Sequence, residues 1–287
     1  MPSPALPRSE TLLAKAKEML EYGPTHMAHL RARESHVGSG ILDDHPTVDW
    51  DARCNAVGYI IELQMKRRLS QETMFHAIGM LDRFLAKEEC PRNILVTVAL
   101  VCLWVSEKLY ELEPMTFDEL GTLSEGHFDK AMLEELELVV VAAQGKHLLS
   151  PDPDTFLQRF FCDLQVSPGC YHMADSKLLG FARFLCEAGA MYGGQFLDLY
   201  ASEAAHGALH RALESLGRST DAILLTERTT VASAMYGRII PHVPELLCRK
   251  YNIAPRRPPQ GKANEEPMAA DGGSPLEEEG TKPGLVA

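Results

Sequence analysis

The sequence predicts an all-α protein with two tandem five-helix units, an N-terminal helix and a disordered C-terminal tail. One observation is the run Ile94–Val105, in which eleven of twelve residues are apolar. A helix that is apolar all round has no face for solvent. The run is shorter than the roughly 20 apolar residues of a transmembrane helix, so we expect it to be the central helix of a bundle. The second observation is that apolar residues recur at helical spacing, whereas no segment alternates with the two-residue period of a strand.

Composition argues against several classes of partner. The chain has 287 residues and a formal net charge of −12. This charge makes nucleic acid an unlikely partner, because binding it needs a basic surface. The seven cysteines include no CxxC pair, which favours reduced thiols and an intracellular home. We expect no membrane partner and no cofactor.

Residues 1–50 are expected to form an N-terminal helix and a linker. Ser9 is a candidate N-cap, and Gly23-Pro24 is expected to end the helix that it starts. A shorter helical piece over 25–33 and a loop over 34–49 would follow.

Residues 51–150 are expected to form the first five-helix unit. Ser70 begins a capping box with Thr73, and Thr116 is a candidate cap after Pro114. The five expected helices are 51–67, 70–85, the apolar run 94–105, 116–123 and 129–143. Short connections between them predict antiparallel or angled neighbours.

Residues 151–253 are expected to form a second unit. The linker that leads into it is expected over 145–154, so its last four residues already belong to the second unit. Its central helix is 201–216, which is rich in alanine and glycine and so permits close approach of its neighbours. The other expected helices are 155–164, 174–190, 221–226 and 232–251. An apolar or small-residue central helix thus recurs about 100 residues along the chain.

Residues 254–287 are expected to be a disordered, acidic, proline-rich tail. The segment contains six prolines and no aromatic residue, so it cannot bury enough apolar surface to become ordered. It has the composition of degradation-signalling tails, with Ser274 as a possible phosphorylation site. A solvated tail without a specific role is the alternative, and composition alone favours it slightly.

Sequence motifs of known catalytic or metal sites are absent. No phosphate loop, HExxH, GxSxG or calcium loop occurs. His206 and His210 are four residues apart and could share a metal, but no clear third ligand lies near. We therefore expect two ordinary helix histidines, no metal and no enzyme.

Several motifs in the first unit resemble those of the cyclin family. Leu81–Leu85 reads LDRFL, a second-helix signature of mitotic and D-type cyclins, and Ser106–Glu111 stands where cyclins have a sequence like ASKxxE. Arg53 and Glu137 match a first-helix arginine and a fifth-helix glutamate, and Pro151–Phe160 matches the entry to a second cyclin fold. The resemblance covers about residues 10–251, and is closest to D-type and A-type cell-cycle cyclins, from which the chain diverges.

The resemblance implies a non-catalytic subunit that binds and activates a cyclin-dependent kinase in cell-cycle control. Lys108, Glu137 and Glu111 would be the kinase-binding residues, and Arg53 and Asp82 would form an internal salt bridge. Glu107 departs from the family pattern and would add a negative charge close to Lys108. Kinase substrates are possible further partners, and the protein would be found in the nucleus and cytoplasm.

A substrate-docking patch is less well matched. The corresponding positions are Ala52, Asn55, Ala56, Tyr59, Glu62 and Val96. Small or polar residues replace large apolar ones, which predicts a shallower pocket. The alternative function is a cyclin-fold scaffold of the transcription machinery, which the acidic balance disfavours and which leaves Lys108 and Glu137 without a role.

Overall fold

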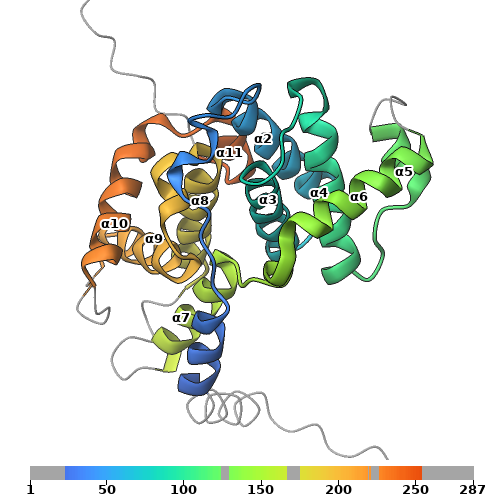
Figure 1. Cartoon of the computed structure of the whole chain (residues 1–287). Coiled ribbons are helices and arrows are strands. Elements are labelled where there is room, and N and C mark those ends of the chain that lie inside the picture. Colours follow the sequence, from blue (N-terminus) through green and yellow to red (C-terminus); the bar gives the residue numbers. More distant parts are fainter. Residues whose placement is uncertain (1–22, 124–128, 167–174, 219, 221–225, 254–287) are drawn as a thin grey trace, which may run out of the picture. The chain divides into compact units, whose positions relative to one another are not determined.

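Helix α4 (Leu95–Tyr110) is the centre of the first helical unit. A computed structural model describes residues 23–123, 129–166, 175–218, 220 and 226–253, which belong to one compact unit and contain no strand (Figure 1). Helices α2 (Trp50–Arg67), α3 (Gln71–Leu85) and α6 (Lys130–Gln144) pack around α4, and the short α5 (Phe117–Leu123) touches it.

The predicted central role of the apolar run is confirmed by burial. Eleven consecutive residues, Thr97–Glu107, are buried in α4. By length and composition alone, Arg92–Tyr110 could also cross a membrane, but most of it is covered by the protein's own helices. The helix therefore serves as the core of the first unit.

Helix starts follow the capping signals in the sequence. Asp49, Ser70, Asp129 and Asp175 each accept a hydrogen bond from the backbone N–H three residues further on. The hydroxyl of Thr73 lies 2.8 Å from that of Ser70, so the predicted pair at the start of α3 is present. Such caps fix where each helix begins.

The second helical unit is built around α9 (Ala201–Ser215), as its small residues predict. Helices α7 (Pro153–Val166), α8 (Ser176–Tyr192) and α10 (Glu227–Ile239) pack against α9. Helix α11 (Glu245–Lys250) contacts both α2 and α8 and so lies between the two units (Figure 1). Short 3₁₀ segments lie at Ser39–Leu42 (η1), Arg92–Ile94 (η2), Gly145–His147 (η3), Gly194–Asp198 (η5) and Ile240–His242 (η6).

One expectation for the helices was wrong. The single helix expected over 232–251 is interrupted at 240–244, because Pro241 and Pro244 each lack a backbone N–H donor. The shorter helical piece expected over 25–33 is present and begins by Gly23, in a helix that runs to residue 32. The helices expected from Ser9 and over 221–226 lie in segments outside the described residues, apart from Thr226, which caps α10.

Candidate protein-binding site on α4 and α6

Lys108 and Glu137 form an ion pair at the surface where α4 meets α6. Their side chains are 33% and 24% exposed, so both remain accessible to a partner. The Nζ atom of Lys108 also lies 3.5 Å from the centroid of the Trp104 ring, within the range of a cation–π contact. The Trp104 indole donates a hydrogen bond of 2.7 Å to the Met115 carbonyl. Lys108 is therefore held by Glu137 and by the Trp104 ring, and the ring is itself fixed by its hydrogen bond to Met115.

Exposed apolar side chains also occur on α4 and α6 and in the loop after α4. Leu109 follows Lys108 on α4, and Leu138 follows Glu137 on α6 and is 71% exposed. Leu112, Met132 and Val139 are exposed as well. Helices usually turn such side chains toward a core, so their exposure favours a protein partner. We use the name α4–α6 face for the surface of these elements, which carries Lys108, Glu137 and the five apolar residues.

Glu107 points into the protein, away from the α4–α6 face. Its side chain is fully buried and accepts hydrogen bonds from Arg67 Nε at 3.1 Å and from the Met115 backbone N–H at 2.7 Å. Burial raises the pKa of Glu107, partly offset by these two donors. The expectation that Glu107 adds a negative charge beside Lys108 was therefore wrong, because Arg67 neutralises it in the interior. The sequence offers no signal for Arg67 as its partner.

Glu111 lies at the end of α4, where it supports the start of α3. Its Oε1 accepts hydrogen bonds from the Ser70 N–H at 2.8 Å and from the Thr73 hydroxyl at 2.6 Å. Burial acts to raise the pKa of Glu111, but these hydrogen bonds outweigh it and hold the pKa below the usual value. This role is structural, and it leaves one carboxylate oxygen for any partner.

Arg53 and Asp82 form the predicted salt bridge between α2 and α3. Arg53 Nε lies 2.6 Å from Asp82 Oδ1, and Nη2 lies 2.8 Å from Oδ2, in a buried bidentate pair. The remaining nitrogen, Nη1, donates to the carbonyls of Ala190 and Met191 at the end of α8. The arginine thus joins three helices, and its link to the second unit was not predicted.

The expected docking patch reaches the surface only in part. Ala52 and Ala56 are buried, because the helical period places them on the inward side of α2. Asn55 and Val96 are exposed, and Glu62 lies 4.0 Å from Lys66 in an exposed ion pair. Tyr59 is half-buried, and its hydroxyl donates to the Leu123 carbonyl at 3.4 Å. The two alanines therefore add nothing to a docking surface.

The other residues singled out in the sequence have ordinary surroundings or lie outside the described residues. His210 Nδ1 lies 3.0 Å from the Ser233 hydroxyl, and the His206 ring packs against Phe160. Among the residues that the structure describes, no group of three potential ligands could hold a metal ion. Ser274 lies outside the described residues.

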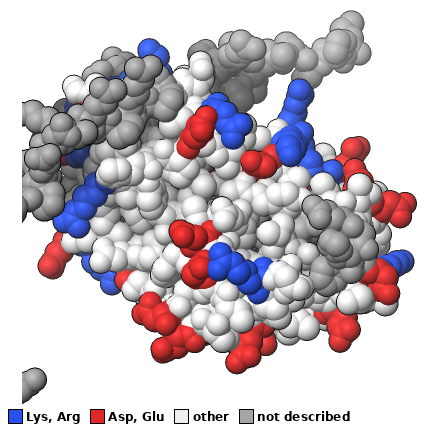
Figure 2. Space-filling model, turned by 90° about the horizontal axis from the view of Figure 1, so that it is seen from above, with Lys and Arg blue, Asp and Glu red and all other residues white. Residues whose placement is uncertain are grey.

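In the view from above, acidic side chains gather along one edge of the molecule (Figure 2).

Comparisons with known proteins find sequence and fold similarity to cyclins. The profile of the cyclin N-terminal domain matches residues 24–143. Cyclin-B3 of Caenorhabditis elegans is 28% identical over 177 residues, which are 61% of this chain and 42% of the relative. The mitotic cyclin cdc13 of Schizosaccharomyces pombe is 25% identical over 62% of this chain and 35% of its own length. The chain thus spans less than half the length of these curated relatives.

A solved structure shares the fold. A viral cyclin from herpesvirus saimiri superimposes with a TM-score of 0.55 over 67% of this chain and 86% of its own, at 17% sequence identity. The relatives named here are B-type cyclins, whereas the motifs suggested D-type and A-type ones. Residues 24–143 thus match the cyclin N-terminal domain, the chain is similar to mitotic cyclins, and its two packed helical units share the fold of a viral cyclin.

Proposed function

We propose that this protein is a cyclin that binds and activates a protein kinase of the cyclin-dependent class, as a non-catalytic subunit acting in cell-cycle control. The observation that carries the proposal is the accessible Lys108–Glu137 pair, together with exposed apolar side chains on the same two helices. The names of the relatives, G2/mitotic-specific cyclins, support the cell-cycle role. We also propose that the protein is found in the nucleus and cytoplasm, which imaging of a fluorescent fusion would test.

The α4–α6 face has the two components that a stable interface needs. The apolar residues supply surface to bury, and a standard interface buries roughly 1,600 Å² in total. Lys108 and Glu137 supply a donor and an acceptor at fixed positions. In the free chain they pair with each other, which spares the cost of ordering two long side chains on binding. A partner that binds this face in only one of its conformations shifts its own population toward that conformation.

The test is recovery of kinase activity from a cell extract with tagged protein. We expect Lys108→Ala/Glu137→Ala to recover at least about tenfold less activity than the wild type, because removing charged hydrogen-bonding groups costs roughly 1.5–3 kcal/mol each. The matched control is Lys130→Ala/Glu134→Ala, which removes the same residue types from an exposed ion pair that lies wholly on α6. It should recover wild-type activity. Equal recovery by both double variants would remove the proposed role of the α4–α6 face.

A further inference from the structure

Four basic residues cluster where the C-terminal end of α6 meets α3. Arg83 lies in the last turn of α3 and Lys87 in the turn that follows it, and Lys146 and His147 lie in η3. Within the described part of the chain, none of the four forms a salt bridge with a carboxylate. Burial, followed by the positive charges of Lys146, Arg83 and Lys87, lowers the pKa of His147. Four cations without a salt bridge to a described carboxylate, on a chain of net charge −12, could accept a ligand of opposite charge.

The guanidinium group of Arg83 is held in place by one of its three nitrogens. Its Nε donates to Gln144 Oε1 at 2.7 Å, and the buried Gln144 amide is itself fixed by donating to the Val140 carbonyl at 2.9 Å. The group folds back over Gly79, where an added Cβ would lie 3.1 Å from Arg83 Nη1. The two terminal nitrogens make no hydrogen bond to any described residue. Arg83 thus presents a fixed fork with its donors free.

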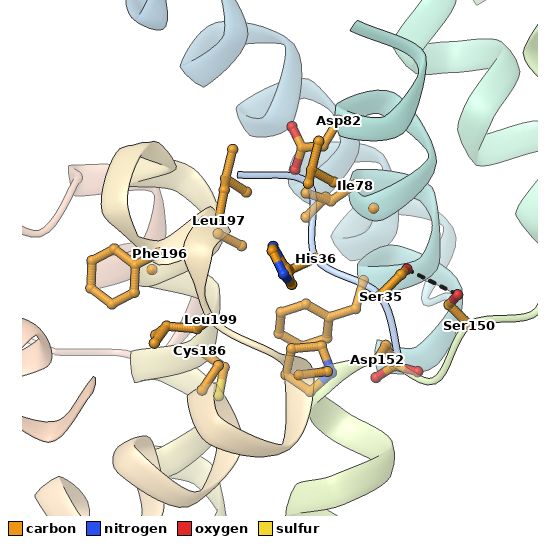
Figure 3. Close-up of a pocket in the computed structure, with 18 of the residues that line it drawn as sticks. Ser35, His36, Ile78, Asp82, Ser150, Asp152, Cys186, Phe196, Leu197 and Leu199 are labelled. Carbon is orange, nitrogen blue, oxygen red and sulfur yellow. Dashed lines mark hydrogen bonds between the residues drawn. The ribbon is translucent and has the colours of Figure 1, made fainter. Parts of the chain in front are cut away.

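Arg83 lies at the edge of a cavity between the two helical units. The cavity has a volume of about 130 Å³ and is closed on one side by the segment that carries Ser35 and His36 (Figure 3). The hydroxyls of Ser35 and Ser150 lie 3.2 Å apart at this cavity. They add neutral donors to the charged ones of Arg83.

The charge of Asp82 acts on Arg83 and partly offsets the effect of burial, which lowers the pKa of Arg83, but no described carboxylate at the cavity is paired with the guanidinium. Both oxygens of Asp82 are taken by Arg53. The Asp152 carboxylate accepts hydrogen bonds from Thr155 and from the Asp154 backbone N–H. Neither carboxylate forms a salt bridge with the guanidinium.

Charge compensation at a helix end accounts for only part of the cluster. The C-terminal end of a helix attracts cations, and Lys87 does donate to the Ala143 carbonyl in the last turn of α6. The other three cations make no hydrogen bond to the carbonyls of that turn. Their free donors are thus left for another acceptor.

We propose that Arg83, Lys146 and His147 form a binding site for a phosphoryl group, either on a phosphorylated side chain or as free phosphate. A guanidinium fork matches two oxygens of a phosphate. The flanking cations suit its charge of about −2 better than the single charge of a carboxylate. The site does not depend on the kinase-binding role proposed for the α4–α6 face.

Binding is measured on the full chain with a degenerate phosphoserine peptide library, its unphosphorylated twin, a twin with glutamate in place of phosphoserine, and inorganic phosphate. We expect the phosphorylated library to bind at least about tenfold more tightly than either twin. Binding by inorganic phosphate as tight as by the library would assign the site to free phosphate. The absence of binding by both phosphorylated probes would overturn the proposal.

Variants then locate the site. Lys146→Ser removes an exposed charge and should weaken binding of the phosphorylated probe by about three- to tenfold, whereas Lys177→Ser, an exposed lysine on α8, should leave binding unchanged. Arg83→Gln should abolish detectable binding. If Arg83→Gln fails to fold, the effect of Lys146→Ser alone tests whether the probe binds at this site. A bound phosphoryl group should also raise the pKa of His147, followed by NMR. Equal effects of Lys146→Ser and Lys177→Ser, or an unchanged His147 pKa, would contradict the proposed position.

Discussion

Glu107 and Lys108 are neighbours in the chain, yet their side chains lie in opposite environments. Glu107 is fully buried between Arg67 and the Met115 backbone, whereas Lys108 is partly exposed over the Trp104 ring. Successive helical residues point about 100° apart, so adjacent charges on α4 need not interact. The buried carboxylate anchors the loop after α4, and it leaves Lys108 with Glu137 as its charged neighbour.

Asp152 gives a prediction for stability against pH. It is fully buried near the start of α7, and burial raises its pKa to about 7. The folded state therefore binds more protons than the unfolded state between about pH 4 and pH 7, so stability from this group is lost as pH rises through that range. Asp152→Asn keeps an acceptor oxygen and removes the titration. The fall in unfolding free energy between about pH 5 and pH 8, measured in urea, should be smaller in the variant than in the wild type.

The control for this measurement is Asp175→Asn at the start of α8. Hydrogen bonds from Arg218 and the Leu178 N–H lower the pKa of Asp175 to about 2. This group stays ionised in both states across the tested range, so its replacement should leave the pH slope unchanged. A slope in Asp152→Asn equal to that of the wild type would show that Asp152 does not titrate as described.

At the scale of elements, α9 and α10 approach so closely that one position on α9 requires glycine. A Cβ added at Gly207 would lie 2.5 Å from the Ala232 Cβ and 2.9 Å from the Ser233 backbone nitrogen. Gly207→Ala should therefore reduce the unfolding free energy by about 1–3 kcal/mol through overpacking. In Gly180→Ala on α8, the new Cβ would meet nothing within 4 Å, so we expect about 0.5–1 kcal/mol of stabilisation. Equal changes in the urea midpoint would contradict the close approach.

The helices could be predicted from the sequence where one face or one composition dominates. The apolar period of α3 and the small residues of α9 predicted both helices and their packing. The burial of Glu107 against Arg67, forty residues earlier in the chain, could not be predicted, because it depends on how α2 and α4 pack. Pro241 and Pro244 signal the break between α10 and α11, whereas the apolar periodicity of the same segment predicts one continuous helix.

The contacts within the candidate site could also be predicted only in part from the sequence. Helical periods alone place Lys108 near the end of one helix and Glu137 within another, and only the resemblance to cyclins brought the two together. The cation–π contact with Trp104 had no signal, since that residue reads as part of an apolar core helix. Pairwise contacts between distant elements depend on the packing angles of helices, which periodicity does not specify.

For the whole molecule, polar contacts join the two helical units. Arg53 on α2 donates to the end of α8. On α11, Lys250 Nζ lies 2.7 Å from Glu187 Oε1 on α8 and 3.6 Å from the Met74 sulfur on α3. The Tyr251 hydroxyl also donates to Glu187, at 2.6 Å. Because these groups are largely buried, separating the two units would leave buried charges without their partners. We therefore expect the two units to unfold together.

The Lys250–Glu187 pair tests this coupling, because both tryptophans, Trp50 and Trp104, lie in the first unit. Lys250→Met leaves the buried Glu187 carboxylate without its cation, which should cost about 3–5 kcal/mol. Burial already raises the pKa of Glu187, so the loss should grow as pH rises. Glu187→Gln/Lys250→Met removes both charges and should recover most of the stability. In urea, tryptophan fluorescence and far-UV circular dichroism should shift by the same amount. A shift in dichroism alone would mean that the units unfold independently.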